Sequence, residues 1–277
     1  METFFSFLEK RVDDCSSLLC VGLDPHVNDL PAPTAASALD FCLNLVRATA
    51  PYAAAFKPNA AFFEVFGAEG WTALKQVIEA IDDESKRLGS LIPVILDAKR
   101  GDIASTAEAY AKSAFENLGV DCITLNPYLG KDSIEPFIQN PEKGVFLLCK
   151  TSNAGSMDMQ NLLVMPMGSD MPMPLYLYVA KLAEQWNTNN NIGIVVGATH
   201  PQIMEMIRAA VPDLWFLSPG IGAQGGELKL ALKAGLRADG KGMLIPISRG
   251  ISRRENPKLA AAEIRDQIVN IKSQLNR

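Results

Sequence analysis

The chain alternates short, continuously apolar segments with longer amphipathic stretches, and this alternation recurs along its whole length. The apolar segments are Leu18–Leu23, Tyr52–Lys57, Ile92–Asp97, Cys122–Asn126, Gly144–Cys149, Ile192–Val196, Trp215–Ser218 and Met243–Ile247. Continuous apolar runs are typical of parallel strands that are buried on both faces. The stretches 68–87 and 257–275 have helical periodicity, and Asn256 and Pro257 form a typical helix start. This pattern predicts a single-domain (β/α)8 TIM barrel over residues 1–277, with a doubly wound open sheet as the alternative.

Composition narrows the classes of function. The net charge of −5 argues against a nucleic-acid surface, because backbone phosphates require clustered Lys and Arg. No apolar run approaches the length of a membrane span, and the N-terminus lacks the features of a secretion signal. The cysteines are odd in number, form no CxxC pair and lie mostly in apolar runs, so they are expected to be reduced core residues of a cytoplasmic protein: Cys15, Cys20, Cys42, Cys122 and Cys149.

One region has no clear period. Residues 153–174 are rich in Met and Pro and follow the fifth predicted strand. In barrels of this type the loops after the strands build the active site. A lid over that site and a surface insertion packed on a helix are both compatible with this sequence.

Polar residues stand where the predicted strands end. Asp24, Lys57, Asp97 and Asn126 end the first four strands, and polar or glycine-containing turns follow the other four. Catalytic groups in barrels come from the C-terminal ends of several strands. These ends are therefore the predicted functional face.

The third strand ends in the densest charged group. Asp97 and Lys99 are two residues apart, so on an extended segment both side chains point to the same side, and Asp102 follows at a turn after Gly101. Two carboxylates around one ammonium can keep Lys99 protonated and orient it as a proton donor. The alternative is an ordinary salt bridge at a strand–helix junction. The polar residues at the other strand ends favour the catalytic interpretation.

A glycine-rich motif follows the seventh predicted strand, at residues 220–225. Its position late in the chain, with no acidic residue after the next strand, argues against dinucleotide binding. We interpret it as a phosphate site in which Gly220, Gly222 and Gly225 let backbone N–H groups approach oxygen atoms. Gly250 would open a short helix whose N-terminus attracts an anion, and Arg249 would add a charged contact.

Other catalytic arrangements find less support. The two histidines, His26 and His200, lie in separate turns without a metal-binding or triad pattern. Lys57 is a candidate for a Schiff base, but an ion-pairing or hydrogen-bonding role is the favoured interpretation.

Taken together, these motifs resemble the orotidine 5′-phosphate decarboxylases, most closely a longer bacterial subclass with the DAKRGDI run. The resemblance covers nearly the whole chain, and it rests on residues 21–25, 56–59, 96–103, 124–128, 150–153, 218–225 and 247–250. It implies cofactor-free decarboxylation of orotidine 5′-monophosphate to UMP and CO₂, with no metal. It also implies a homodimer with shared active sites.

The same resemblance implies a role for each residue of the charged group. Asp97 would lie beside the substrate carboxylate, and Lys99 would protonate C6 after CO₂ departs. Lys57 and Asp102 would complete the array. Asp102 and Thr106 would reach into the site of the partner subunit.

The remaining implied roles concern substrate binding. Asp24 and Lys57 would contact the ribose, and Ser152 would hydrogen-bond the pyrimidine amide edge. Gln224 and Arg249 would hold the phosphate, and the substrate-binding set is completed by Asn126, Gly222 and Gly250. The subclass has Pro where this chain has Ala154.

Two rival functions remain open at this point. One is a metal-dependent sugar-phosphate lyase of the same superfamily, which shares the DxKxxD element. The other is a barrel that binds a phosphate ligand without catalysis. Residues 151–153 and Gln224 favour a nucleotide base over an acyclic sugar.

Overall fold

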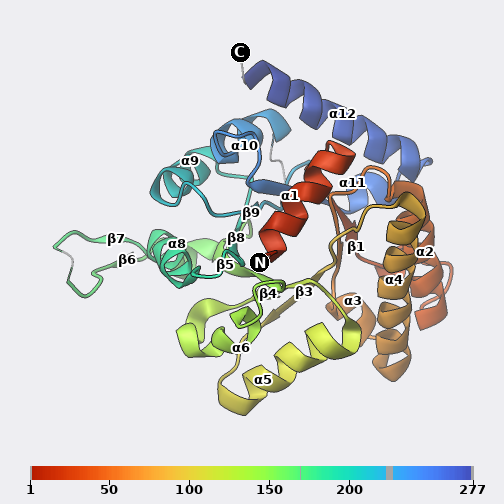
Figure 1. Cartoon of the computed structure of the whole chain (residues 1–277), viewed down its shortest axis with the longest axis horizontal. Coiled ribbons are helices and arrows are strands. Elements are labelled where there is room, and N and C mark those ends of the chain that lie inside the picture. Colours follow the sequence, from red (N-terminus) through yellow and green to blue (C-terminus); the bar gives the residue numbers. More distant parts are fainter. Residues whose placement is uncertain (1, 169, 223–226, 276–277) are drawn as a thin grey trace.

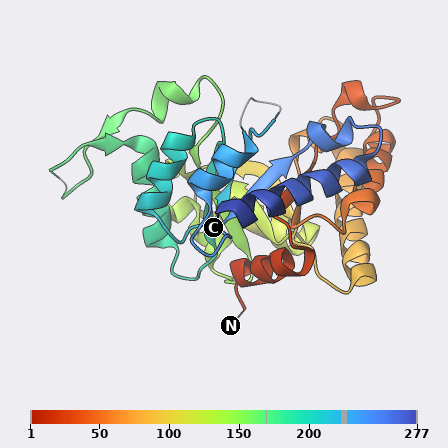
Figure 2. The ribbon, with the colours of Figure 1, turned by 90° about the horizontal axis from the view of Figure 1, so that it is seen from above.

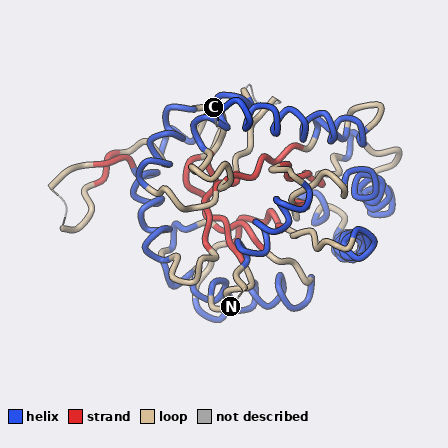
Figure 3. Tube along the Cα trace, turned by 45° about the horizontal axis from the view of Figure 1, so that its top comes forward, coloured by secondary structure: helices blue, strands red, loops and turns tan. Residues whose placement is uncertain are grey.

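The computed structural model describes residues 2–168, 170–222 and 227–275. Over these residues the principal strands form one parallel sheet in the order β2-β1-β10-β9-β8-β5-β4-β3. Parallel bridges at Phe56–Val94 and Asn59–Asp97 join β2 to β3, the two ends of that order, so the sheet closes on itself. Helices surround the ring of strands (Figure 3). The predicted single-domain (β/α)8 barrel is confirmed, and the open sheet is not observed.

The strands of the barrel are β1 (Leu19–Leu23), β2 (Ala55–Pro58), β3 (Ile95–Arg100), β4 (Cys122–Leu125), β5 (Gly144–Lys150), β8 (Ile192–Val196), β9 (Phe216–Leu217) and β10 (Met243–Ile247). The helices are α1 (Phe4–Cys15), α2 (Ala35–Thr49), α3 (Ala61–Glu64), α4 (Gly67–Leu88), α5 (Ala104–Lys112) with a π-helical continuation (Ser113–Leu118), α6 (Glu135–Ile138), α7 (Ser156–Met159), α8 (Leu175–Trp186), α9 (Pro201–Ala210), α10 (Leu228–Gly235), α11 (Arg249–Ser252) and α12 (Pro257–Leu275). Asn256 caps α12 as predicted, because its Oδ1 accepts the Leu259 N–H at 3.1 Å.

Two strands, β2 and β3, begin three residues later than their apolar runs suggest. The second starts at Ala55 because the N–H groups of Tyr52 and Ala53 donate to the Thr49 carbonyl in a turn after α2. The third was expected at Ile92–Asp97 and is found at Ile95–Arg100. A bulge between Leu96 and Arg100 lets the pairing of β3 with β4 continue as far as Arg100. In the sequence these charged residues resemble the end of a strand.

Helix α1 covers the end of the barrel where the strands begin, as seen face-on in Figure 1 and from the side in Figure 2. Phe5 stacks on Trp215, just before β9, with ring centroids 5.8 Å apart, and meets Phe146 of β5 edge-on at 5.7 Å. Gly144 begins β5 beneath the Phe4 ring, where an added Cβ would lie 2.2 Å from it. Aromatic side chains thus close this end of the barrel.

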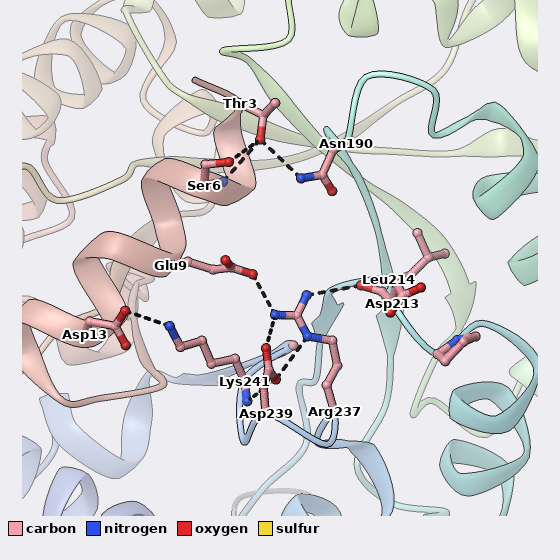
Figure 4. A network of polar contacts seen from close by, with 12 residues as sticks. Thr3, Ser6, Glu9, Asp13, Asn190, Asp213, Leu214, Arg237, Asp239 and Lys241 are labelled. Atoms are coloured by element: carbon pink, nitrogen blue, oxygen red, sulfur yellow. Dashed lines mark hydrogen bonds and ion pairs between the residues drawn. The ribbon is translucent and has the colours of Figure 1, made fainter. Parts of the chain in front are cut away.

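Polar contacts hold α1 in place around these rings (Figure 4). Arg237 donates to Glu9 and to Asp239, both at 2.6 Å, and Lys241 donates to Asp13 at 2.6 Å. These contacts tie the first helix to the turn before β10.

The irregular region after β5 contains α7 and an antiparallel pair of short strands, β6 (Leu163–Val164) and β7 (Met173–Pro174). The pair extends away from the ring of strands in all three overall views (Figures 1–3). Met167 at its tip is fully exposed. Closure of residues 153–174 over the site stays a prediction.

All five cysteines are free and buried, as predicted. Within the described residues, no helix has both the length and the apolar character needed to cross a bilayer.

Phe5→Ala is expected to lower the free energy of unfolding by about 3–5 kcal/mol, because it empties a site that is 1% exposed between two aromatic rings. Equilibrium unfolding in urea measures this loss. Val65→Ala, at a position 65% exposed, is the control and should change stability by less than about 0.5 kcal/mol. An equal effect of the two substitutions would show that α1 contributes nothing to the closed barrel.

Candidate active site

The charged residues of β2 and β3 meet around one carboxylate. Lys57 Nζ lies 2.8 Å from Asp97 Oδ2, and Lys99 Nζ lies 2.5 Å from Asp97 Oδ1. The side chains of Lys57 and Asp97 are 9% and 12% exposed, whereas that of Lys99 is 50% exposed. Lys57 and Asp97 therefore form a nearly buried ion pair, and the Lys99 side chain is half exposed to solvent.

The predicted proximity of Asp97 and Lys99 is confirmed, but the local backbone is not a regular strand. Lys99 has φ +48°, in the left-handed region that costs a non-glycine residue about 1–2 kcal/mol. Thr124 of β4 offsets part of this strain, because its Oγ1 accepts the N–H groups of Ala98 at 3.1 Å and Lys99 at 3.0 Å. The bulge and Thr124 together direct Lys99 towards Asp97.

Thr124 also belongs to the site itself. Its hydroxyl donates to Asp97 Oδ1 at 3.0 Å, and the side chain is buried. Thr124 has no predicted role, because a Thr inside an apolar run resembles an ordinary strand residue. Its place one residue before the end of β4 was the available signal.

The charges alternate differently from the prediction for a single chain. The sequence predicts two carboxylates around Lys99, but in the structure two ammonium groups flank Asp97. Asp102 Oδ1 instead accepts the Ile103 N–H at 2.8 Å, and it makes no ion pair within the described part of the chain. Asp102 therefore lies outside the intrachain array.

Electrostatics keep the buried pair ionised. Burial acts to lower the pKa of Lys57, but the charges of Asp97 and Asp24 outweigh it and raise that pKa above its ordinary value. Burial acts to raise the pKa of Asp97, but Lys57 and Lys99 outweigh it and hold that pKa well below its ordinary value. Lys57 is thus an ion-pairing residue, in agreement with the favoured interpretation.

A cavity of about 660 Å³ adjoins this array at the C-terminal ends of the strands. Asp24 and Lys57 line this cavity, and so do Gly222, Arg249 and Gly250. Gly222 has φ +75°, which suits its turn, and α11 begins at Arg249, one residue before the expected position. The cavity thus brings the predicted ribose contacts and the predicted phosphate loop together. Gln224 and Gly225 lie outside the described residues.

Several polar atoms at these strand ends are buried without a partner. Within the described residues they include Asp24 Oδ1, Thr199 Oγ1, Ser218 Oγ and Ser248 Oγ. A buried polar group without a hydrogen bond is costly, and such groups gather where a ligand completes them. Ser248, which lines the cavity, was missed as a site residue.

The remaining predicted residues occupy the loops around the array. Ser152 follows β5 and lies against Gly197 after β8, where an added Cβ would be 3.0 Å from Ser152. Asn126 is exposed and caps the turn after β4, since its Oδ1 accepts the Tyr128 N–H at 3.1 Å. Thr106 is exposed on α5. No group of three or more His, Cys, Asp and Glu side chains among the described residues is arranged to hold a metal ion.

The fold and the site define a class of protein: a (β/α)8 barrel with a Lys–Asp–Lys array beside a glycine-lined cavity. Comparison with known proteins narrows this class. Residues 17–264 match the sequence model of the orotidine 5′-phosphate decarboxylase / HUMPS family. The orotidine 5′-phosphate decarboxylase of Roseiflexus sp. (strain RS-1) is 45% identical, over 94% of this chain and 92% of that protein. That of Roseiflexus castenholzii is 44% identical, over 96% of this chain and 97% of that protein.

A solved structure agrees. The OMP decarboxylase of Leishmania donovani superposes with a TM-score of 0.87 and 52% identity, covering 98% of this chain and all of that one. The chain belongs to the orotidine 5′-phosphate decarboxylase / HUMPS family.

Asp97→Asn is expected to destabilise the fold by about 3 kcal/mol at neutral pH, because it leaves the buried Lys57 ammonium without its carboxylate. Since folding depresses the pKa of Asp97, its contribution is present above the unfolded-state pKa of about 3.9 and is lost as the pH falls towards the folded-state pKa. The difference between wild type and variant should therefore be flat from pH 7 to about 4 and shrink below it.

Urea unfolding at a series of pH values measures this difference. Asp83→Asn is the matched control, because that side chain is 81% exposed and should show little effect at any pH. A difference that stays constant through the acid range would contradict the assigned ion pairs.

Proposed function

We propose that the protein decarboxylates orotidine 5′-monophosphate to UMP and CO₂, without a metal or cofactor, in pyrimidine biosynthesis. The observation that carries this proposal is the Lys57–Asp97–Lys99 array beside the glycine-lined cavity. The curated relatives that match almost the whole chain bear the name of that enzyme.

The array suits a reaction that builds negative charge on carbon. Cleavage of the bond between C6 and the carboxylate leaves its electron pair on C6 and releases CO₂. Lys99, the more exposed of the two ammonium groups, donates a proton to C6, and solvent reprotonates the resulting amine. A fixed ammonium stabilises the developing charge without reorganisation of solvent. Asp97 keeps Lys99 in place and puts a negative charge next to the substrate carboxylate.

The cavity suits the rest of a nucleotide. Arg249 and the backbone near Gly222 would hold the phosphate, and Asp24 and Lys57 would contact the ribose. Ser152, in the loop after β5, would hydrogen-bond the pyrimidine. Because the phosphate takes no part in bond cleavage, its binding energy can organise the loops around C6 and so raise kcat.

We further propose that the protein is a homodimer with shared sites and that it works in the cytoplasm. Ile103, next to Asp102 in the chain, and Tyr128 and Leu129, in the turn after the neighbouring strand β4, are apolar and are 50%, 76% and 48% exposed. A partner subunit that covers these side chains would bring its own Asp102 carboxylate towards Lys99, as the resemblance implies. Sedimentation equilibrium tests this: a monomer at micromolar concentration would exclude the dimer. The cytoplasmic location fits the five free cysteines.

Lys99→Ala should lower kcat by a factor of about 10²–10⁴ or more, because it removes the proton donor. UMP binding should remain measurable, since the Lys57–Asp97 pair persists. Decarboxylation is followed by the loss of substrate absorbance, and binding by calorimetry. Near-normal kcat in this variant would refute the assigned role.

Two matched variants sharpen that test. Lys112→Ala removes an exposed lysine of α5, at a side chain 74% exposed, and should leave both readouts unchanged. Arg249→Ala should raise KM by about 10–100-fold with a smaller effect on kcat, because its contact is to the non-reacting phosphate. The same split between kcat and KM for Lys99 and Arg249 would contradict the division of roles.

Chelation separates this activity from that of a metal-dependent sugar-phosphate lyase. Decarboxylation by the purified protein should be unchanged after treatment with EDTA. Loss of activity that is restored by Mg²⁺ or Mn²⁺ would overturn the cofactor-free reaction.

A further inference from the structure

A glutamine, Gln160, bridges the two ends of the loop that carries Ser152. Gln160 Oε1 accepts the Thr151 N–H at 2.9 Å, and Gln160 Nε2 donates to Thr151 Oγ1 at 2.8 Å. The two bonds join the end of α7 to the residue just before Ser152. A side-chain amide that binds one residue through both its atoms fixes that residue in position and in orientation.

The same glutamine anchors the loop to the barrel wall. Its backbone carbonyl accepts the Tyr176 N–H at 3.0 Å, in the first turn of α8. Helix α8 packs against β5 and β8, so its first turn is part of the scaffold. Gln160 thereby connects the Ser152 loop to an element that does not depend on the loop itself.

A second hydrogen bond, between Lys150 and Ser156, also holds this loop. Lys150, the last residue of β5, is 2% exposed, and its Nζ donates to Ser156 Oγ at 2.9 Å. Burial lowers the pKa of this ammonium, and no carboxylate pairs with it within the described parts of the chain. Ser156 is itself buried, so this bond ties the end of β5 to α7.

Gly197, the residue after β8, lies close to Ser152. The Gly197 N–H donates to the Lys150 carbonyl at 2.7 Å, and Gly197 approaches Ser152 so closely that a Cβ there would lie 3.0 Å from the Ser152 backbone nitrogen. Ser152 is therefore in close contact with Gly197, and Gln160 adds a separate constraint on the same segment through its two bonds to Thr151.

We propose that Gln160 is a positioning residue for recognition of the pyrimidine base, acting through Thr151 on Ser152. The inference rests on the proposed function, since it assumes that Ser152 contacts the base. A polar contact is useful to binding when its group is already held in the bound geometry, because ordering it on binding would cost affinity. Gln160 supplies that order from outside the site.

Gln160→Leu tests this, because it keeps the approximate size of the side chain and removes both bonds to Thr151. Two probes are compared by calorimetry: UMP, which carries the base, and ribose 5-phosphate, which lacks it. The variant should bind UMP about 10–100-fold more weakly and bind ribose 5-phosphate like the wild type. KM for orotidine 5′-monophosphate should rise more than kcat falls.

Two further variants guard against a general loss of structure. Gln160→Glu keeps an acceptor for the Thr151 N–H and should lose less UMP affinity than Gln160→Leu. Gln76→Leu changes an exposed glutamine of α4 and should alter neither probe. Unchanged UMP binding in Gln160→Leu would overturn the inference, and so would an equal loss of UMP and ribose 5-phosphate binding.

The wild-type protein separates this inference from the function on which it rests. If it binds UMP but does not decarboxylate orotidine 5′-monophosphate, the proposed reaction fails while the comparison of UMP with ribose 5-phosphate still decides the role of Gln160. If it does not bind UMP, both fail.

Discussion

The ion pair between Lys57 and Asp97 joins the two strands at which the sheet closes. Between β2 and β3 the barrel has isolated bridges in place of a continuous ladder, and one of these bridges involves Asp97 itself. The same contact between β2 and β3 therefore closes the ring of strands and assembles the charged site. Removing two charges from water is expensive, and well-packed apolar side chains at such a position often stabilise a protein as well or better. The presence of charges here is better explained by chemistry than by stability.

The backbone at the charged site is strained. Lys99 has a left-handed conformation within a bulged strand, and Thr124 receives the two N–H groups that the bulge displaces. Strain of this kind persists only where surrounding structure holds it. The opposite end of the barrel is well packed, with Phe5 between Trp215 and Phe146. The packed aromatic end of the barrel thus stabilises the fold and offsets the strain at the end that carries the charged site.

Sequence patterns predicted the barrel well, because buried parallel strands are the elements that hydrophobicity reports most directly. They misplaced both ends of β3, which begins at Ile95 and continues through Lys99 and Arg100, whereas hydrophobicity alone would end the strand at Asp97. The pairing of Asp97 with Lys99 followed from local spacing. The pairing of Asp97 with Lys57 did not, because it depends on how the ring closes.

Other site residues escaped prediction for definite reasons. Thr124 resembles any strand threonine, and Gln160 lies in a segment without periodicity, so neither has a local signal of its role. Asp102 is a different case. Its carboxylate turns to its own backbone within one chain, so its predicted part in the array depends on a second copy, which no pattern within one sequence describes.

The array by itself does not select a substrate, and the loops around it must. A carboxylate between two ammonium groups can serve any reaction that passes through a carbanion, and a barrel of this kind hosts many chemistries. Selection requires two fixed points on either side of the reacting carbon. The phosphate pocket near Arg249 would supply one, and Ser152, held through Thr151 by Gln160, would supply the other. The barrel sets the distance between these two points. That distance would decide which molecules place a carboxyl carbon against Lys99. Specificity for the substrate would then come from the spacing of the two loops, rather than from the charged residues between them.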